Sequence, residues 1–210
     1  MVTRVLLVRH GAVDLEGIAY GQRVDPALSD RGRGEVAALR RRLEADGPDH
    51  LRLDGQPPRV VVRSPTVRTA ETCALLGWTD TQLDARFAER DLGSWEGRPW
   101  AQLWPQAPAG VTTDPARFAA FTPPGGEPLE AVQQRVVTAL EELAREHGVE
   151  QPDAVPPVAV VCHGGPIRCA LAHVLGLQPA AVLRVRLATA SATWLTRWPD
   201  GSWTVEGVAT

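Results

Sequence analysis

Three short apolar runs stand out along the chain, at residues 5–8, 60–62 and 158–161. Each is a continuous series of Val, Leu or Ala and does not alternate with polar residues. This pattern is typical of strands that are buried on both faces of a parallel sheet. Residues 184–187 and 193–198 predict two later strands, near an edge of that sheet.

Between these runs, apolar residues recur at helical spacing. The pattern predicts helices over residues 30–45, 66–76, 129–146 and 165–175. Turn-forming and glycine residues stand at the expected helix ends, which supports these bounds. Alternating strands and helices predict a three-layer α/β/α sandwich, with a mostly parallel sheet and helices on both faces.

Two segments carry neither pattern. Residues 51–58 predict a plain surface connection. Residues 106–126 are rich in Pro, Ala and Gly and predict a cap over the carboxyl ends of the strands. With the loop that precedes it, the cap segment spans about 92–126, within a single domain that covers 1–210.

The composition is that of a globular protein of 210 residues with a net charge of −3. All 22 basic residues are arginine, so lysine-dependent chemistry such as Schiff-base formation is excluded. The mild negative charge gives no reason to expect a nucleic-acid partner, and no apolar run approaches the length of a membrane span. Three cysteines form no even set, and together with the start of the chain they predict a cytoplasmic protein with reduced thiols.

Similar chemistry follows each of the three apolar runs. Arg9 and His10 follow the first, Arg63 and then Arg68 follow the second, and His163 follows the third. Ligands of parallel sheets bind at the carboxyl ends of the strands, where these side chains would converge. Arginine and histidine beside helix N-termini form a site for a dianion, and a phosphoryl group fits best.

Two residue types could attack phosphorus. A neutral imidazole such as that of His10 can form a phosphohistidine that water later cleaves. The alternative is a cysteine, because Cys162 to Arg168 spells C-x-x-x-x-x-R and Trp198-Pro199-Asp200 resembles an acid loop. Histidine is favoured, since the cysteine mechanism leaves Arg9-His10-Gly11 and Arg68 without a role.

A third alternative is a zinc site that uses His10 and His163, but the neighbouring arginines would repel a cation. Phosphoryl transfer to histidine also needs an acid that protonates the leaving alkoxide. Glu89 and Glu96, in a charged loop, are the candidates for that acid.

The combination Arg9-His10-Gly11, Ser64-Pro65-x-x-Arg68-Thr69 and His163-Gly164-Gly165 resembles the histidine phosphatase superfamily, also called phosphoglycerate mutase-like. The resemblance implies that His10 is the phosphorylated residue, that Arg9 and Arg68 hold the phosphate together with Gly164, and that His163 completes the pocket. It places the proton donor at Glu89. It implies no metal or organic cofactor, a structural role for Arg168 and no role for Arg63.

Residues 17–22, which contain Tyr20 and Gln22, resemble the α-ribazole phosphatase branch and place these two side chains against the substrate. The expected activity is therefore hydrolysis of a small phosphorylated metabolite, with α-ribazole 5'-phosphate as the candidate. Ala12-Val13 and Glu16 depart from the pattern of many relatives, which weakens the case for a mutase. A phosphoglycerate mutase-type phosphotransferase and a non-catalytic phosphometabolite-binding protein remain alternatives, and the oligomeric state stays open.

Overall fold

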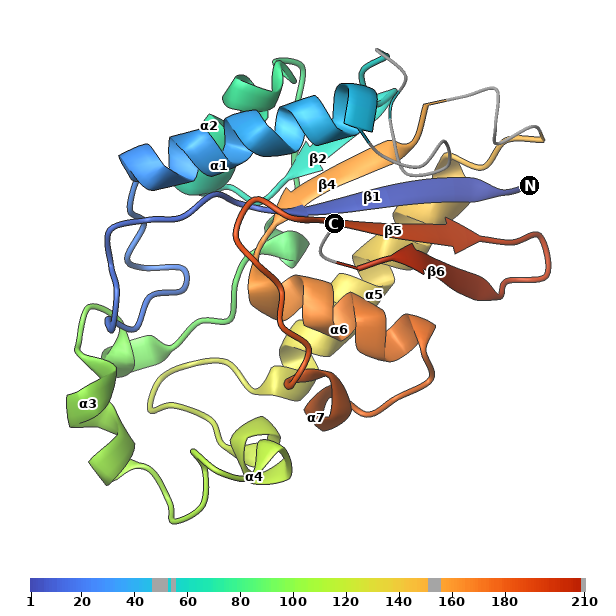
Figure 1. The fold of residues 1–210 in the computed structure, drawn as a ribbon. Coiled ribbons are helices and arrows are strands. Elements are labelled where there is room, and N and C mark those ends of the chain that lie inside the picture. The colour runs from blue at the N-terminus through green and yellow to red at the C-terminus, as the bar shows by residue number, and fades with distance from the viewer. Residues whose placement is uncertain (47–52, 54–55, 151–155, 209–210) are drawn as a thin grey trace.

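A computed structural model describes residues 1–46, 53, 56–150 and 156–208 of the chain. Its centre is one six-stranded sheet in the order β3-β2-β4-β1-β5-β6 (Figure 1). The first four strands of that order run parallel, β5 runs antiparallel to them, and β6, antiparallel to β5, has their direction again. The strands are β1 (Thr3–Arg9), β2 (Val60–Arg63), β3 (Gln82–Leu83), β4 (Val158–Cys162), β5 (Ala192–Arg197) and β6 (Trp203–Gly207).

Helices cover both faces of this sheet, as the sequence predicts. α1 and α2 pack on one face and α5 and α6 on the other (Figure 1). Each face has its own apolar core, because alternate residues of β1 and β4 point to opposite sides. The helices are α1 (Asp30–Arg41), α2 (Val67–Leu76), α3 (Trp100–Leu103), α4 (Pro115–Ala120), α5 (Leu129–Glu146), α6 (Gly164–Val174) and α7 (Pro179–Val182).

The predicted helices agree closely with these bounds. α1 ends at Arg41, and a π-helical turn continues it to Asp46. The Ser29 hydroxyl accepts a hydrogen bond from the Gly32 amide and begins α1, whereas Gly77, with φ at +80°, ends α2. The surface connection predicted at 51–58 falls largely on residues outside the described part.

One predicted strand is wrong. Residues 184–187 form no strand: Arg184 lies in a turn after α7, and residues 185–187 have no regular secondary structure. The carbonyl oxygens of Val185 and Leu187 accept hydrogen bonds from Arg168 and Arg9, at 3.1 and 2.6 Å. These carbonyl groups therefore bind site arginines and are not paired in a sheet.

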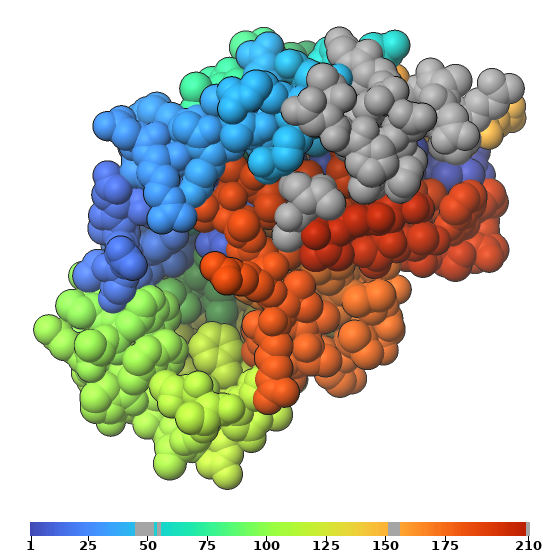
Figure 2. All heavy atoms as spheres, in the orientation of Figure 1, coloured from blue at the N-terminus to red at the C-terminus, as the bar shows by residue number. Residues whose placement is uncertain are grey.

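The segment between η4, a short 3-10 helix at Gly93–Trp95, and α5 lies beyond the carboxyl ends of the strands. It contains α3 and α4 and has a small core of its own around Trp95 and Leu103. Figure 2 shows this cap (green) beside the loop that follows β1 (blue) and beside the connection before β5 (orange). Three segments distant in sequence thus surround one end of the sheet. Among the described helices, none is long and apolar enough to cross a membrane.

Candidate active site

The sheet register brings the three predicted strand ends together. Arg9 pairs with Cys162 across β1 and β4, so His10 and His163 follow at the same level. Their rings lie 5.1 Å apart, centre to centre, and both are buried. β2 pairs with the other edge of β4, which places Ser64 beside this pair. The neighbouring parallel strands β2, β4 and β1 thus end at the same level and bring together the residues that the sequence analysis places in one site.

The His10 imidazole is held by the backbone that follows it. Its Nδ1 lies 2.7 Å from the carbonyl oxygen of Gly11, which can only accept, so Nδ1 carries the proton. The lone pair is then on Nε2. Gly11 must be glycine here, because an added Cβ would lie 2.7 Å from the carbonyl oxygen of Gly32 in α1. The backbone of α1 therefore approaches close enough to fix the turn that holds the imidazole.

Burial, reinforced by the nearby Arg68 charge, lowers the pKa of His10 to about 3. The pKa of His163 is also well below its ordinary value, because of burial and then the charge of His10. Both imidazoles are therefore neutral near pH 7. A neutral imidazole is the form that can attack phosphorus.

These shifts predict a loss of stability in acid. The unfolded chain binds protons at a pKa near 6.5 and the folded His10 only near 3, so stability is full above pH 6.5 and falls as the pH drops towards 3. Between pH 7.5 and 5 the loss due to His10 is about 2 kcal/mol. We expect urea unfolding in phosphate-free buffer to show that His10→Gln loses correspondingly less stability over this range than the wild type. An identical loss in both proteins would contradict the depressed pKa, and His147→Gln serves as the matched control.

Arg68 is the most constrained cation of the site. Its side chain is fully buried, and its guanidinium pairs with Asp25 at 2.9 Å and donates to the carbonyl oxygen of Gly21 at 2.6 Å. The Tyr20 ring lies 5.3 Å from the guanidinium carbon. Sequence reasoning missed Asp25, because nothing in the local pattern around residue 25 indicates that it contacts α2.

Arg9 and His163 are held in a similar way. Arg9 donates to the carbonyl oxygen of Leu187, and His163 Nε2 lies 2.8 Å from the Ser64 hydroxyl. A Ser64 hydroxyl that donates to Nε2 leaves the imidazole proton of His163 on Nδ1. The contact with Ser64 thus holds the His163 ring in place beside His10.

Three buried nitrogen atoms around His10 have no hydrogen-bond partner within the described part of the chain. They are Arg9 Nε, Arg68 Nε and His163 Nδ1. A buried donor without a partner costs about 1–3 kcal/mol, and proteins keep few of them. Each of the three strand ends thus brings one unpartnered buried nitrogen to the surroundings of His10.

Glu89 contacts the start of α6, two residues beyond His163. Its carboxylate accepts from the amide of Gly165, at the start of α6, and from that of Arg90, at 3.1 and 2.9 Å. A Cβ on Gly165 would lie 2.0 Å from Glu89 Oε1, so the contact requires glycine. The predicted acid candidate is thus brought to the site. Its backbone carbonyl accepts from the side chain of Gln22.

Glu96, the other acid candidate, has a different role. Its carboxylate accepts from the amides of Gly21, Gln22, Arg23 and Val24 at 2.8–3.0 Å and from that of Leu92 at 3.2 Å. With these bonds it fixes the loop whose Gly21 carbonyl holds Arg68. Glu96 is therefore a positioning residue and is not placed to protonate a leaving group.

Arg135 of α5 is a second positioning residue that the sequence did not indicate. Its guanidinium pairs with Glu127 at 2.8 Å and donates to the carbonyl oxygens of Arg86, Ala88 and Glu89. These bonds hold the backbone that carries Glu89. Only the spatial proximity of α5 to this loop reveals the role.

Two of the remaining candidate residues, Arg63 and Asp200, lie away from the reacting centre, whereas Gly164 lies beside Arg9. Arg63 donates to the Thr81 hydroxyl and to the Ser64 carbonyl, on the β3 side of the sheet. Asp200, of the proposed acid loop, accepts from Ser202 in the turn between β5 and β6. Gly164 lies between Arg9 and Arg168, because a Cβ there would be 3.5 Å from Arg9 Nε and 3.0 Å from an Arg168 nitrogen.

The Cys162 thiol is unsuited to attack. It is buried in the apolar core on the α5–α6 face, and burial raises its pKa far above the ordinary value. A thiol that stays protonated is a poor nucleophile. We expect Cys162→Ser to keep phosphatase kcat/KM within about threefold of the wild type, with a somewhat lower Tm from the buried hydroxyl. Loss of activity in a folded Cys162→Ser protein, checked by circular dichroism, would restore the cysteine mechanism.

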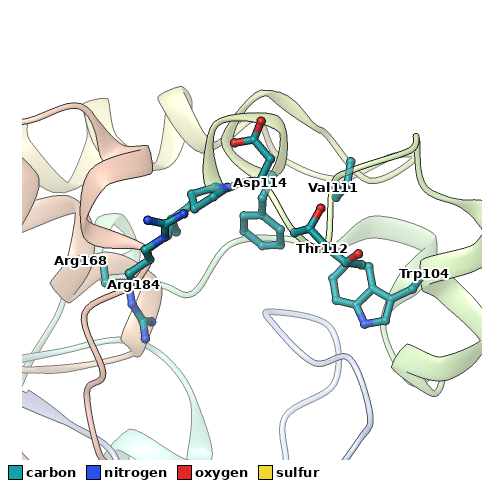
Figure 3. A pocket seen from close by; sticks show the side chains of 10 residues that line it. Trp104, Val111, Thr112, Asp114, Arg168 and Arg184 are labelled. Carbon is teal, nitrogen blue, oxygen red and sulfur yellow. The ribbon is translucent and has the colours of Figure 1, made fainter.

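A cavity of about 270 Å³ extends outward from Glu89. Its wall includes Tyr20, Trp100 and Phe118 and is mostly apolar. A second cavity of about 600 Å³ shares Phe118, Arg168 and Leu183 with the first and opens under the cap (Figure 3). Of the candidate catalytic residues, Glu89 lines the smaller cavity, whereas Arg9, His10, Arg68 and His163 line neither of the two. Trp95, by contrast, is buried in the cap core.

Fold and site together define an α/β protein with an anion pocket around a neutral histidine. The chain matches the histidine phosphatase superfamily (branch 1) over residues 5–210 and belongs to that superfamily. This confirms the superfamily predicted from the three motifs. The predicted α/β architecture with its mostly parallel sheet and the enzyme class, a histidine phosphatase, are confirmed as well.

Several known proteins are similar to this chain. The glucosyl-3-phosphoglycerate phosphatase of Mycobacterium tuberculosis is 30% identical over 95% of this chain and 88% of its own length. The native structure of the mycobacterial enzyme of that name superimposes with a TM-score of 0.81 at 27% identity, and covers 100% of both chains. A metal-independent phosphoserine phosphatase of Arabidopsis thaliana is 27% identical over 80% of this chain and 66% of its own.

Proposed function

We propose that this protein hydrolyses phosphomonoesters of small metabolites through a phosphohistidine on His10. The strongest support is the set of unpartnered donors from Arg9, Arg68 and His163 around a neutral imidazole. The phosphoryl oxygens would accept from these donors, and arginine charge would stabilise the transition state. Neither a metal ion nor an organic cofactor is needed for this route.

The reaction divides into two transfers. The Nε2 lone pair of His10 attacks phosphorus in line with the ester bond, the P–O bond breaks, and the leaving oxygen takes its electron pair and a proton from Glu89. Water then attacks the phosphohistidine, the P–N bond breaks towards His10, and the water proton passes to Glu89. Inorganic phosphate and the original enzyme result.

The substrate is proposed from the cavity beyond Glu89. Tyr20, Trp100 and Phe118 provide aromatic surface on which a base or ring can stack, which supports α-ribazole 5'-phosphate. The similarity to glucosyl-3-phosphoglycerate phosphatases supports a phosphorylated sugar acid as the second candidate.

Phosphate release from a panel of esters tests this proposal. We expect turnover of p-nitrophenyl phosphate, α-ribazole 5'-phosphate and glucosyl-3-phosphoglycerate at different rates, inhibition by vanadate, and full activity after treatment with EDTA. Isomer formation from 3-phosphoglycerate with a trace of bisphosphate would favour the mutase alternative. Binding of these esters without any turnover would favour a non-catalytic protein.

A further inference from the structure

Glu35, in the second turn of α1, is a carboxylate beside the backbone that follows His10. Its Oε2 accepts from the amide of Ala12 at 3.1 Å and from the Thr189 hydroxyl at 2.6 Å, and its Oε1 accepts from Arg31 at 2.8 Å. Burial raises the pKa of Glu35, but these three hydrogen bonds outweigh burial and hold the pKa below its ordinary value. The side chain is therefore an anion at neutral pH, and both oxygens only accept.

One peptide group connects this carboxylate with the nucleophile. The carbonyl oxygen of Gly11, which accepts from His10 Nδ1 at 2.7 Å, and the N–H of Ala12, which donates to Glu35, belong to the same planar peptide group. Glu35 therefore fixes the plane of the group that holds the imidazole. A hydrogen bond to a carboxylate also polarises the peptide group, so its carbonyl oxygen becomes a stronger acceptor for the Nδ1 proton.

The surrounding backbone holds the carboxylate and the peptide group together. α1 packs directly on this part of the chain, because a Cβ on Gly32 would lie 2.0 Å from the Ala12 carbonyl oxygen. Thr189, the second donor to Oε2, lies in the turn before β5, and the amide of the next residue donates to the carbonyl oxygen of His10 at 3.0 Å. The carboxylate thus joins the chain after His10 to a turn that binds the His10 backbone itself.

The contact matters most during the attack on phosphorus. As the Nε2 lone pair of His10 forms the P–N bond, the ester P–O bond breaks and its electron pair leaves with the alcohol oxygen, so the imidazole gains positive charge. The proton stays on Nδ1. Its hydrogen bond to the Gly11 oxygen then becomes charge-assisted, and Glu35 holds the other end of the same peptide group. An interaction that strengthens towards the transition state raises the rate of the chemical step more than substrate affinity.

We propose that Glu35 is a positioning residue for the reaction, which orients the His10 imidazole and supports its developing positive charge through the Gly11–Ala12 peptide group. This inference rests on the proposed function and adds to it a residue that acts through the backbone. Helix α1 thereby contributes to the chemistry from behind the nucleophile.

Two substitutions separate the charge of Glu35 from its hydrogen bonds. Glu35→Gln keeps an oxygen that accepts from Ala12 and Thr189 but removes the charge, whereas Glu35→Ala removes both. Stopped-flow release of p-nitrophenolate, with enzyme in excess over p-nitrophenyl phosphate, gives the rate constant of His10 phosphorylation and the affinity for the ester separately. We expect the rate constant to fall about fivefold in Glu35→Gln and about 30-fold or more in Glu35→Ala, with affinity within about twofold of the wild type.

Glu44→Gln is the matched control. Glu44 pairs with Arg40 at 2.8 Å and with the same i,i+4 spacing as Glu35 with Arg31, so the substitution removes an equivalent ion pair and should leave the rate constant unchanged. Thr3→Val controls for lowered stability, because it removes a buried hydrogen bond to the Ala144 carbonyl oxygen at the opposite end of β1. Its Tm should fall while its phosphorylation rate constant stays that of the wild type.

The proton on His10 Nδ1 provides a readout that does not depend on turnover. In ¹H NMR spectra it should give a downfield signal that is absent from His10→Gln. Glu35→Gln should move this signal upfield, because the Gly11 oxygen becomes a weaker acceptor, and Glu44→Gln should leave it in place.

Three results would overturn the proposal: a signal at the same position in the wild type and both Glu35 variants, an unchanged phosphorylation rate constant in Glu35→Ala, or a loss of ester affinity in place of rate. Equal losses of rate in Glu35→Ala and Thr3→Val would also overturn it, because lowered stability would then explain both. Failure of the proposed function looks different, since the wild type itself would release no p-nitrophenolate while the NMR comparison would still test the contact.

Discussion

Replacement of His10 with Ala is expected to lower kcat for phosphate release by roughly 10⁴-fold or more, because it removes the atom that forms the covalent bond. The donors of Arg9, Arg68 and His163 remain, so vanadate and phosphate should still bind. Steady-state kinetics with p-nitrophenyl phosphate and calorimetry with vanadate measure the two effects separately. His147→Ala, a histidine at the end of α5, is the matched control and should behave as the wild type.

The same prediction can be tested at the level of the intermediate. The wild type is mixed with ³²P-labelled ester and the reaction is stopped rapidly without acid. The protein should then carry a covalent label, and this label should be lost in acid and stable in alkali. Peptide mapping should place it on His10. Label that survives acid, or that maps to Cys162, would contradict the histidine mechanism.

The centre of this site was predictable from the sequence for a physical reason. Arg9 ends a buried strand, and His10 and His163 each follow directly on one. Because parallel strands end at one edge of the sheet, the local pattern and the topology together place these residues side by side. Arg68 lies in the first turn of α2, shortly after the buried strand β2, so its position near the same edge of the sheet was predictable as well.

The residues that support the centre could not be predicted in this way. Asp25 contacts Arg68 across 43 positions of the chain, and Glu96 binds amides more than 70 positions away. Arg135 reaches the Glu89 backbone from another helix. Their roles depend on distances between elements, which no local pattern contains. By residue type and local pattern, Glu96 and Glu89 are equivalent carboxylates in one charged loop, and only the family resemblance separates them.

The wrong strand at 184–187 has a related cause. Its alternating Arg, Val and Leu residues fit a strand, but their carbonyl groups bind Arg9 and Arg168. A segment that lies against a functional site can thus lose its sheet pairing to side chains of that site. The contact of Arg168 with the Val185 carbonyl oxygen agrees with the structural role that the resemblance implies for it.

Glu89→Gln is expected to lower kcat for alkyl phosphates by about 10²–10⁴-fold, because an alkoxide leaves slowly without a proton. p-Nitrophenolate leaves without protonation, so kcat for p-nitrophenyl phosphate should fall much less. The ratio of the two kcat values therefore reports proton donation and separates it from positioning. Glu130→Gln, an exposed glutamate in the first turn of α5, is the matched control.

Gly165→Ala offers an independent route to the same effect. The added Cβ would lie 2.0 Å from Glu89 Oε1 and must displace that carboxylate, whereas alanine itself is favourable within α6. We expect the variant to fold and to lose alkyl phosphatase activity selectively, as Glu89→Gln does. Equal losses with both leaving groups, in either variant, would show that Glu89 holds the start of α6 in place and does not donate the proton. The two substitutions act on one carboxylate, so their combined effect should not exceed that of Glu89→Gln alone.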